Sequence, residues 1–223
     1  MVRSLSRDTD TKLNRRRSRN AKAEGSQSKP RRRLAPATRR AELLATALSI
    51  FARRGIGRAT HAEVATDAGC SLATTFVYFP TRDDLLSAVL SEVERFYTDM
   101  VAAEHRRDVT ADDAIRNQFE AFSNSVSVHP DYARIWLEWS TAIREDIWPR
   151  YLTFQERVVA ELSSTIERGK AEGAIVADID GDDAARLMIG AATMLVQMKF
   201  SGQADEKIAH FVRTMMAAAF GIR

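Results

Sequence analysis

The sequence predicts an all-α fold, with three short helices at the N-terminal end and six further helices behind them. Apolar residues recur at helical spacing, as at Leu44, Leu48 and Phe51. Most expected helix starts carry a capping residue or a proline. No run of alternating apolar and polar residues predicts a strand. The 223 residues, of which 45% are hydrophobic, suffice to bury a core of this kind.

The first three helices are expected over residues 39–54, 60–68 and 71–78. Thr38 is the expected N-cap of the first helix, and Gly55 ends it, because glycine readily adopts the left-handed conformation that follows many helices. Thr60 and Glu63 have the spacing of a capping box, in which each side chain accepts a backbone N–H of the other residue. Ser71 is the expected N-cap of the third helix.

The later helices are expected to start at Thr81, Thr110, Pro130 and Asp146 and, for the last two, to span 181–200 and 204–220. Thr81 and Asp84 repeat the capping-box pattern. Pro149 fits the first turn of its helix, where a backbone N–H has no helical partner to lose. The sequence therefore predicts one domain over residues 38–85 and a second over 86–223.

Charge is divided unevenly along the chain. Residues 1–40 contain 14 Lys and Arg against 3 Asp and Glu, whereas residues 41–223 contain 19 against 27. Residues 1–29 have almost no large apolar side chain, so we expect a disordered basic tail, followed by a basic arm over residues 30–37. A basic end on an acidic body favours contact with a polyanion, either nucleic acid or an anionic membrane.

Several classes of protein are excluded or disfavoured. A single cysteine excludes an intramolecular disulfide, and no apolar run approaches the roughly 20 residues of a membrane-spanning helix. The first residues lack the apolar core of a secretory signal, so we expect a cytoplasmic protein without a membrane partner. The histidines are far apart and no glycine-rich phosphate loop is present, so we expect no enzyme, no metal and no cofactor.

A tight turn is expected between the second and third helices. The small Ala65 permits close helix approach and Gly69 permits a positive φ, although any helical hairpin can show this spacing. The third helix then offers small and hydroxyl side chains suited to phosphates or base edges in a major groove. Phe76 and Phe79 are expected to be core residues, because so short a helix must bury something.

Three segments carry a resemblance to a known family, namely RRGIGR at 53–58, HAEVA at 61–65 and SLATTFVYFPTRDDL at 71–85. Together they resemble the DNA-binding domain of TetR-family transcription regulators. Within that family the chain is most similar to the quorum-sensing master regulators of the LuxR/HapR/SmcR type, also through WLEWS at 136–140 and EDIWP at 145–149. The resemblance implies a helix-turn-helix DNA-binding domain, a regulatory and dimerisation domain, and a homodimer on a palindromic operator in double-stranded DNA.

The resemblance also implies DNA contacts from the arm and from the helix-turn-helix. Arg31 and Arg33 would enter the minor groove, where arginine is favoured. The residues expected to contact DNA from the folded domain are Thr60, His61, Ser71, Ala73, Thr74, Thr75, Tyr78 and Arg82. Ala73 and Thr75 are the expected base contacts. Val77 stands where the subgroup typically has asparagine, and valine lacks the hydrogen bonds of an amide, so the operator preference is expected to differ.

Aromatic residues on four expected helices are consistent with either a plain core or a ligand cavity. Aromatic stripes at helical spacing are ordinary in cores, whereas the resemblance implies a cavity for a small apolar ligand. The residues expected to line this cavity are Tyr97, Met100, Phe119, Phe122, Trp136, Trp139, Tyr151, Phe154 and Gln155. Gln155 is the expected polar anchor.

The last two expected helices carry apolar faces that fit a dimer interface. The expected interface residues are Leu187, Gly190, Ala191, Met194, Met198, Phe211, Val212 and Met215. The same residues could cover the core of a single chain, but two DNA-binding heads require a dimer.

These observations predict a transcriptional regulator that binds its operator as a homodimer with an affinity changed by a small apolar ligand, and the resemblance adds a role in quorum sensing. The alternative is a nucleoid- or RNA-associated protein that binds through its basic tail without an operator. That alternative predicts steep salt dependence without sequence discrimination.

Overall fold

The computed structural model describes residues 35–105 and 108–220. The expected tail over residues 1–29 and residues 30–34 of the expected arm, including Arg31 and Arg33, lie outside the described residues. The described residues from 37 onward belong to one compact unit. The domain boundary expected after residue 85 falls inside a long helix, and the boundaries stay a prediction.

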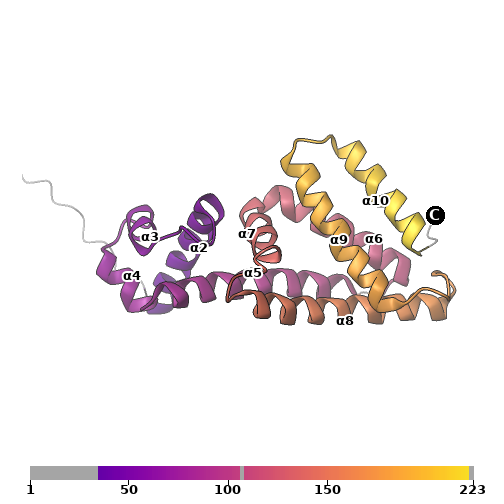
Figure 1. The fold of residues 1–223 in the computed structure, drawn as a ribbon, viewed down its shortest axis with the longest axis horizontal. Coiled ribbons are helices and arrows are strands. Elements are labelled where there is room, and N and C mark those ends of the chain that lie inside the picture. The colour runs from indigo at the N-terminus through magenta and orange to yellow at the C-terminus, as the bar shows by residue number, and fades with distance from the viewer. Residues whose placement is uncertain (1–34, 106–107, 221–223) are drawn as a thin grey trace, which may run out of the picture. The chain divides into compact units, whose positions relative to one another are not determined.

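The all-α prediction is confirmed, since residues 35–105 and 108–220 contain nine helices and no strand (Figure 1). The helices are α2 Pro36–Arg54, α3 His61–Asp67, α4 Leu72–Tyr78, α5 Arg82–His105, α6 Ala111–Val128, α7 Pro130–Ser140, α8 Trp148–Glu172, α9 Gly181–Phe200 and α10 Asp205–Phe220. None of these helices is long and apolar enough to cross a membrane.

The capping boxes form as predicted. The Glu63 N–H donates to Thr60 Oγ1 over 3.3 Å, and the Thr60 N–H donates to Glu63 Oε2 over 3.2 Å. The backbone N–H groups of Thr81 and Asp84 are satisfied in the same reciprocal way, each over 3.0 Å. These local bonds set where α3 and α5 begin, because they satisfy N–H groups that the helix itself leaves unpaired.

Two expected helix starts are wrong. Thr38 is not an N-cap, because α2 already begins at Pro36, and proline is well suited to a first helical turn. Asp146 does not cap α8, which begins at Trp148 after Ile147 and has Pro149 in its first turn. In both cases the proline marks the start of the helix better than the capping residue that we expected.

Two apolar clusters form the core of the described chain. The first runs from the N-terminal helices into the later ones, and includes Phe51, Leu85 and Trp139. The second lies among α5, α6, α8, α9 and α10 and includes Ile166 and Phe220. Helices α5 and α8 run side by side (Figure 1), so α5 is shared between the N-terminal helices and the later bundle.

Candidate functional site

The turn between α3 and α4 is held by a glycine and a short backbone bond. Gly69 has a φ of +58°, in the left-handed region that glycine adopts without strain. The Cys70 N–H donates to the Ala65 carbonyl over 2.9 Å, and Ala65 is buried. The small Ala65 side chain and the positive φ of Gly69 together let α3 and α4 meet closely, in the arrangement of a helix-turn-helix.

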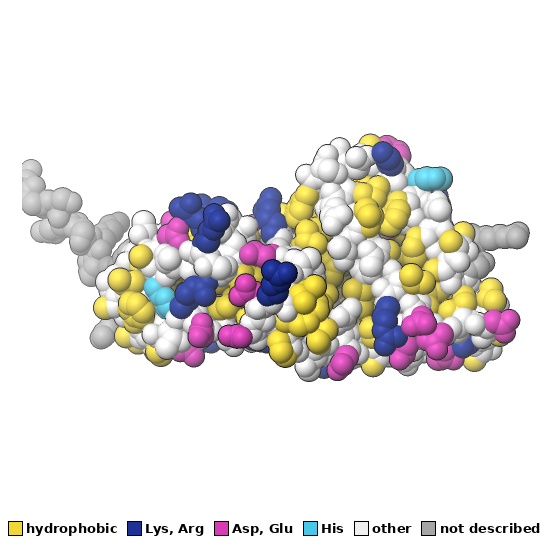
Figure 2. Space-filling view, in the orientation of Figure 1, with side chains coloured by type: hydrophobic (Ala, Val, Ile, Leu, Met, Phe, Trp, Pro, Cys, Tyr) yellow, Lys and Arg dark blue, Asp and Glu magenta, His cyan; other side chains and the backbone are white. Residues whose placement is uncertain are grey.

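The surface of α4 differs from the expected one. Thr75 is fully buried and its hydroxyl donates to the Leu72 carbonyl over 2.7 Å, so its expected role as a base contact is wrong. Phe76 was expected in the core but is 44% exposed, and Val77 is 76% exposed. Phe79 is buried, as predicted. Figure 2 shows hydrophobic side chains gathered on the surface over this end of the molecule.

Two further residues expected at DNA instead hold the helix-turn-helix together. His61 is buried, and its Nε2 lies 2.8 Å from the Phe79 carbonyl oxygen. Arg82 donates to the Ile56 carbonyl through Nη2 and to the Ala59 carbonyl through Nε. One ring nitrogen of His61 and two guanidinium nitrogens of Arg82 are thus bonded to the backbone, which gives both side chains a structural role within the helix-turn-helix.

The other expected DNA contacts lie at the surface of α3 and α4. Thr60, Ser71 and Ala73 are exposed, and Thr74 and Tyr78 are half-buried. The hydroxyls of Ser71 and Thr74 lie 2.8 Å apart and bond to each other. These five residues stay candidates for DNA contact.

A cavity of about 60 Å³ lies among α5, α6, α7, α8 and α9. Seven of the nine expected lining residues border it, namely Tyr97, Phe119, Phe122, Trp136, Tyr151, Phe154 and Gln155. The sequence did not point to the remaining wall, formed by Val101, Gln118, Val158, Leu162, Met188, Ile189 and Ala192. The structure therefore brings most of the expected residues together around one space.

Two expected cavity residues lie elsewhere. Trp139 is fully buried, stacks on Phe154 with ring centroids 5.6 Å apart, and donates from Nε1 to the Ile147 carbonyl over 3.0 Å. Met100 packs against the first apolar cluster. Trp139 therefore belongs to the packed core, and Met100 is half-buried at the edge of that core, so neither borders the cavity.

The cavity is apolar except for a few polar atoms. The Tyr97 hydroxyl and Gln118 Oε1 are buried and make no hydrogen bond of ordinary geometry with any described residue. Burial raises the pKa of Tyr97, so the phenol keeps its proton. Gln155, the expected anchor, is half-buried at the same wall. A bound molecule with one polar group could satisfy Tyr97 and Gln118, because unpaired buried polar atoms are costly.

The helices around the cavity are tied to the helix-turn-helix by α7. The Glu138 carboxylate accepts the Ile56 N–H over 2.9 Å, at the loop that follows α2. Trp136, two residues earlier on α7, borders the cavity. One short helix therefore touches both the cavity and the backbone between α2 and α3.

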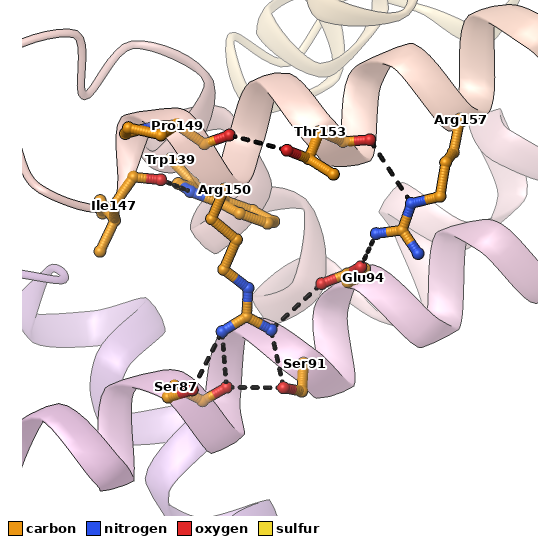
Figure 3. A network of polar contacts seen from close by, with 9 residues as sticks. All are labelled: Ser87, Ser91, Glu94, Trp139, Ile147, Pro149, Arg150, Thr153 and Arg157. Atoms are coloured by element: carbon orange, nitrogen blue, oxygen red, sulfur yellow. Dashed lines mark hydrogen bonds and ion pairs between the residues drawn. The ribbon is translucent and has the colours of Figure 1, made fainter.

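A second polar network joins α5 to α8 next to the cavity (Figure 3). Glu94 on α5 accepts from Arg150 over 3.1 Å and from Arg157, both on α8. Arg150 also donates to the Ser87 carbonyl over 3.1 Å and to the Ser91 hydroxyl over 2.7 Å. These bonds fix the two long helices against each other along their polar side.

The helices expected to form a dimer interface expose only part of the predicted surface. Leu187 is 59% exposed and Met194 is 47% exposed, and Gly190 lies exposed between them on α9. Ala191 is buried inside the chain, so it cannot contribute to an outer face. The other expected residues are half-buried against the core, namely Met198, Phe211, Val212 and Met215.

The helix-turn-helix coincides with a match to a known family. Residues 43–89 match the family described as bacterial regulatory proteins, tetR family. This part of the chain is a tetR-family domain. The tetR-family domain runs from within α2 to within α5, and so includes α3, α4 and the turn at Gly69.

The chain has a curated relative. The HTH-type transcriptional regulator LuxR of Vibrio harveyi is 41% identical over 125 residues, which are 56% of this chain and 61% of LuxR. The match thus spans about three fifths of that relative's length. The resemblance to LuxR-type members of the TetR family is confirmed, and the matching relative and family are regulators, as the prediction of a non-enzyme requires.

Solved structures share the fold beyond the tetR-family domain. A putative transcriptional regulator from Saccharomonospora viridis in complex with choline is 22% identical, with a TM-score of 0.71 over 82% of this chain and 96% of that chain. The regulator FadR from Bacillus subtilis in complex with stearoyl-CoA is 16% identical, with a TM-score of 0.67 over 82% and 99%. At these identities the likeness establishes the fold of the whole described chain.

Proposed function

We propose that this chain is a transcriptional regulator that binds an inverted-repeat operator in double-stranded DNA as a homodimer. The observation that carries the proposal is the tetR-family helix-turn-helix, whose second helix, α4, is exposed along one side. The excess of basic residues over positions 1–40 adds attraction to phosphates. A function on genomic DNA fits the cytoplasmic location expected from the sequence.

The proposed dimer presents two copies of α4 to successive major grooves. Two-fold symmetric half-sites would lie about 34–36 Å apart, one helical turn of DNA. Within each half-site, Thr60, Ser71, Thr74 and Tyr78 contact phosphates through their hydroxyl groups, and Ala73 faces the bases. Arg31 and Arg33 would supply the contacts in the minor groove.

The test is selection of the purified full chain on a random duplex library at about 150 mM salt, where the Debye length is about 8 Å. An enriched inverted repeat, bound by two chains, is the expected result. Binding without sequence preference would instead support the nucleoid- or RNA-associated alternative that acts through the basic tail.

Two variants then separate the proposed DNA contacts on the selected operator. Tyr78→Ala should weaken binding to all duplexes about equally, because a phosphate contact carries no sequence information. Replacing Arg31 and Arg33 by Ala should weaken A·T-flanked operators most. Equal losses on all flanks from both variants would contradict the role of the arm.

The second part of the proposal is that a small, mostly apolar molecule with one polar group binds the cavity. Its polar group would satisfy Gln118 Oε1, which is buried without a hydrogen bond of ordinary geometry to any described residue, and would bond the buried Tyr97 hydroxyl, which interacts with the Ser125 side chain. At about 60 Å³ the cavity holds a few waters, whereas ligand sites usually reach about 300 Å³ or more, so binding must widen it. Two regulators that share the fold have been solved in complex with choline and with stearoyl-CoA, which supports a ligand for this chain.

Widening of the cavity gives the ligand a way to change DNA affinity. Movement of Trp136 would shift α7, and with α7 the Glu138 bond to the Ile56 N–H beside the helix-turn-helix. A ligand that favours one arrangement of the two heads changes operator affinity by its differential affinity for the two states, commonly about 1 to 3 kcal/mol. The resemblance to LuxR-type regulators extends the proposal to ligands or genes of quorum sensing.

A matched pair of ligands tests the polar anchor. Apolar compounds and their alcohol analogues of equal size are compared by quenching of tryptophan fluorescence, since Trp136 borders the cavity. The native chain should prefer the alcohols, and Gln118→Leu should weaken that preference, because only the Tyr97 hydroxyl then remains as a partner, while binding of the hydrocarbons is kept. Equal binding of both series to the native chain would contradict the anchor.

A further inference from the structure

We propose that α4 recognises thymine methyl groups in the major groove, through an exposed apolar face centred on Val77. The inference rests on the proposed function and specifies which chemical group the helix reads. In this proposal Val77, which makes no hydrogen bond, takes the place of Thr75 as the expected base contact.

The register of α4 places Val77 at its outermost point. Successive helical residues are rotated by about 100°, so Ala73 and Val77 lie roughly opposite Thr75. Thr75 is fully buried, which fixes the inner side of the helix, and Val77 is 76% exposed. Leu72 and Phe76, each 44% exposed, widen the apolar face on one side.

Three hydroxyl groups on and next to α4 already make a bond within the helix and its cap, which leaves them no free direction towards the centre of the groove. Ser71 and Thr74 bond to each other over 2.8 Å, and Thr75 donates to the Leu72 carbonyl over 2.7 Å. Direct reading of guanine or adenine in the major groove uses Arg, Lys, Asn or Gln, and residues 71–78 contain none of these. The outward chemistry of the helix is therefore apolar.

The one apolar group that base pairs present in the major groove is the C5-methyl of thymine. Val77 and Ala73 end in methyl groups that match it in size. Phe76 is less free to adapt, because its ring stacks on His61 with centroids 4.6 Å apart. Val77 is therefore the expected reader, with Ala73 beside it.

The charge around the apolar face fits DNA as its occupant. Residues 68–82 contain no Asp or Glu, so no carboxylate from this segment repels the phosphates beside the groove. Thr60, at the start of α3, is exposed, and Tyr78 is half-buried, so both are placed for phosphate contact. The apolar face can therefore contact base edges in the major groove while the hydroxyl groups beside it contact the flanking phosphates.

The test replaces thymine by uracil, one position at a time, in the operator obtained by selection. Uracil lacks only the methyl group and keeps the hydrogen-bonding edge of thymine. Loss of one buried methyl should weaken binding by the native chain about fourfold, and about fifteen-fold when both half-sites lose it, as follows from about 0.8 kcal/mol for each buried methylene-sized group. The loss should occur at one defined thymine in each half-site.

Variants of two exposed valines assign that loss to α4. Val77→Ala should bind thymine and uracil operators equally, because the contacting methyl groups are gone. Val128→Ala, at the 59% exposed last residue of α6, should keep the full difference. Val77→Asn should shift the selected base at this position towards adenine, with which an amide forms two hydrogen bonds. Both positions are exposed, so folding is expected to be unaffected.

The outcomes separate the inference from the function on which it rests. If a defined operator binds but every thymine can be replaced by uracil without loss, or if Val77→Ala keeps the native loss, the methyl contact is wrong and the regulator remains. If selection yields no preferred duplex at all, the regulator and the methyl contact fail together.

Discussion

At the scale of single residues, His61 is held by one hydrogen bond and one ring contact inside the helix-turn-helix. We predict that His61→Ala lowers the free energy of unfolding by about 1–3 kcal/mol, because the Phe79 carbonyl then loses its partner in a buried site. The exposed His210 is the matched control, and His210→Ala should change stability by less than about 0.5 kcal/mol. Urea denaturation measures both. A DNA-contacting His61 would instead leave stability unchanged.

His105 gives the chain a predictable response to pH. Its Nδ1 lies 2.6 Å from Thr165 Oγ1, and burial together with the charge of Arg168 lowers its pKa to about 4. In the unfolded chain histidine has a pKa near 6.5, so between about pH 6.5 and 4 the unfolded chain binds a proton that the folded chain does not. The free energy of unfolding should fall by about 3 kcal/mol as the pH drops through this window.

The variant His105→Gln isolates this contribution from the titration of carboxylates. The difference in stability between the native chain and the variant should shrink as the pH falls from 7 to 4.5, measured by urea denaturation at each pH. A difference that stays constant over this range would show that His105 takes up its proton equally in both states. His210→Gln, at an exposed position, should follow the native curve.

At the scale of elements, α7 is the part that connects the cavity with the helix-turn-helix. Glu138→Ala removes the acceptor of the Ile56 N–H, and we predict that amide exchange at Ile56 becomes about fivefold faster, corresponding to about 1 kcal/mol. Glu138→Gln keeps an acceptor oxygen and should restore most of the protection. Glu156→Ala, on the exposed side of α8, is the control. Unchanged exchange in Glu138→Ala would show that the bond does not hold this loop.

The helices themselves could be predicted well from local chemistry. Thr60, Ser71 and Thr81 each begin a helix where expected, because a cap depends only on residues three positions apart. Phe76 was misplaced for the opposite reason. Which side of a two-turn helix is buried depends on distant partners, and here Thr75 takes the inner position.

The cavity could be predicted in part, from its aromatic residues. Gln118 was missed because a single glutamine on an amphipathic helix resembles a surface residue until its neighbours are known. The contribution of α9 was missed because the whole helix was assigned to the dimer. In the structure Met188 borders the cavity, whereas Leu187 is exposed, so one helix divides its apolar residues between two roles that composition cannot separate.

At the scale of the whole molecule, the proposed function requires a second chain, and the exposed strip on α9 is where it is expected. Leu187, Gly190 and Met194 are spaced by three and four residues, so they share one face of the helix. Two exposed apolar side chains on either side of a glycine allow two α9 helices to approach closely across a two-fold axis. In a single chain the same strip would leave apolar surface in water.

A substitution at Gly190 should change the stability of the single chain and the stability of the dimer in opposite directions. A Cβ atom at Gly190 would meet no described atom within 4 Å, and leucine is a better helix former, so we predict that Gly190→Leu raises the stability of the single chain by a few tenths to about 1 kcal/mol. In the dimer the added side chain would collide with the partner's α9 and raise the dissociation constant about tenfold or more. Dimerisation, measured by sedimentation equilibrium, and operator binding should therefore both weaken, while resistance to urea at low protein concentration increases.

Val176→Glu, at a 52% exposed position in the loop before α9, is the control and should leave the dimer intact. A Gly190→Leu chain that dimerises like the native one would move the interface away from this strip.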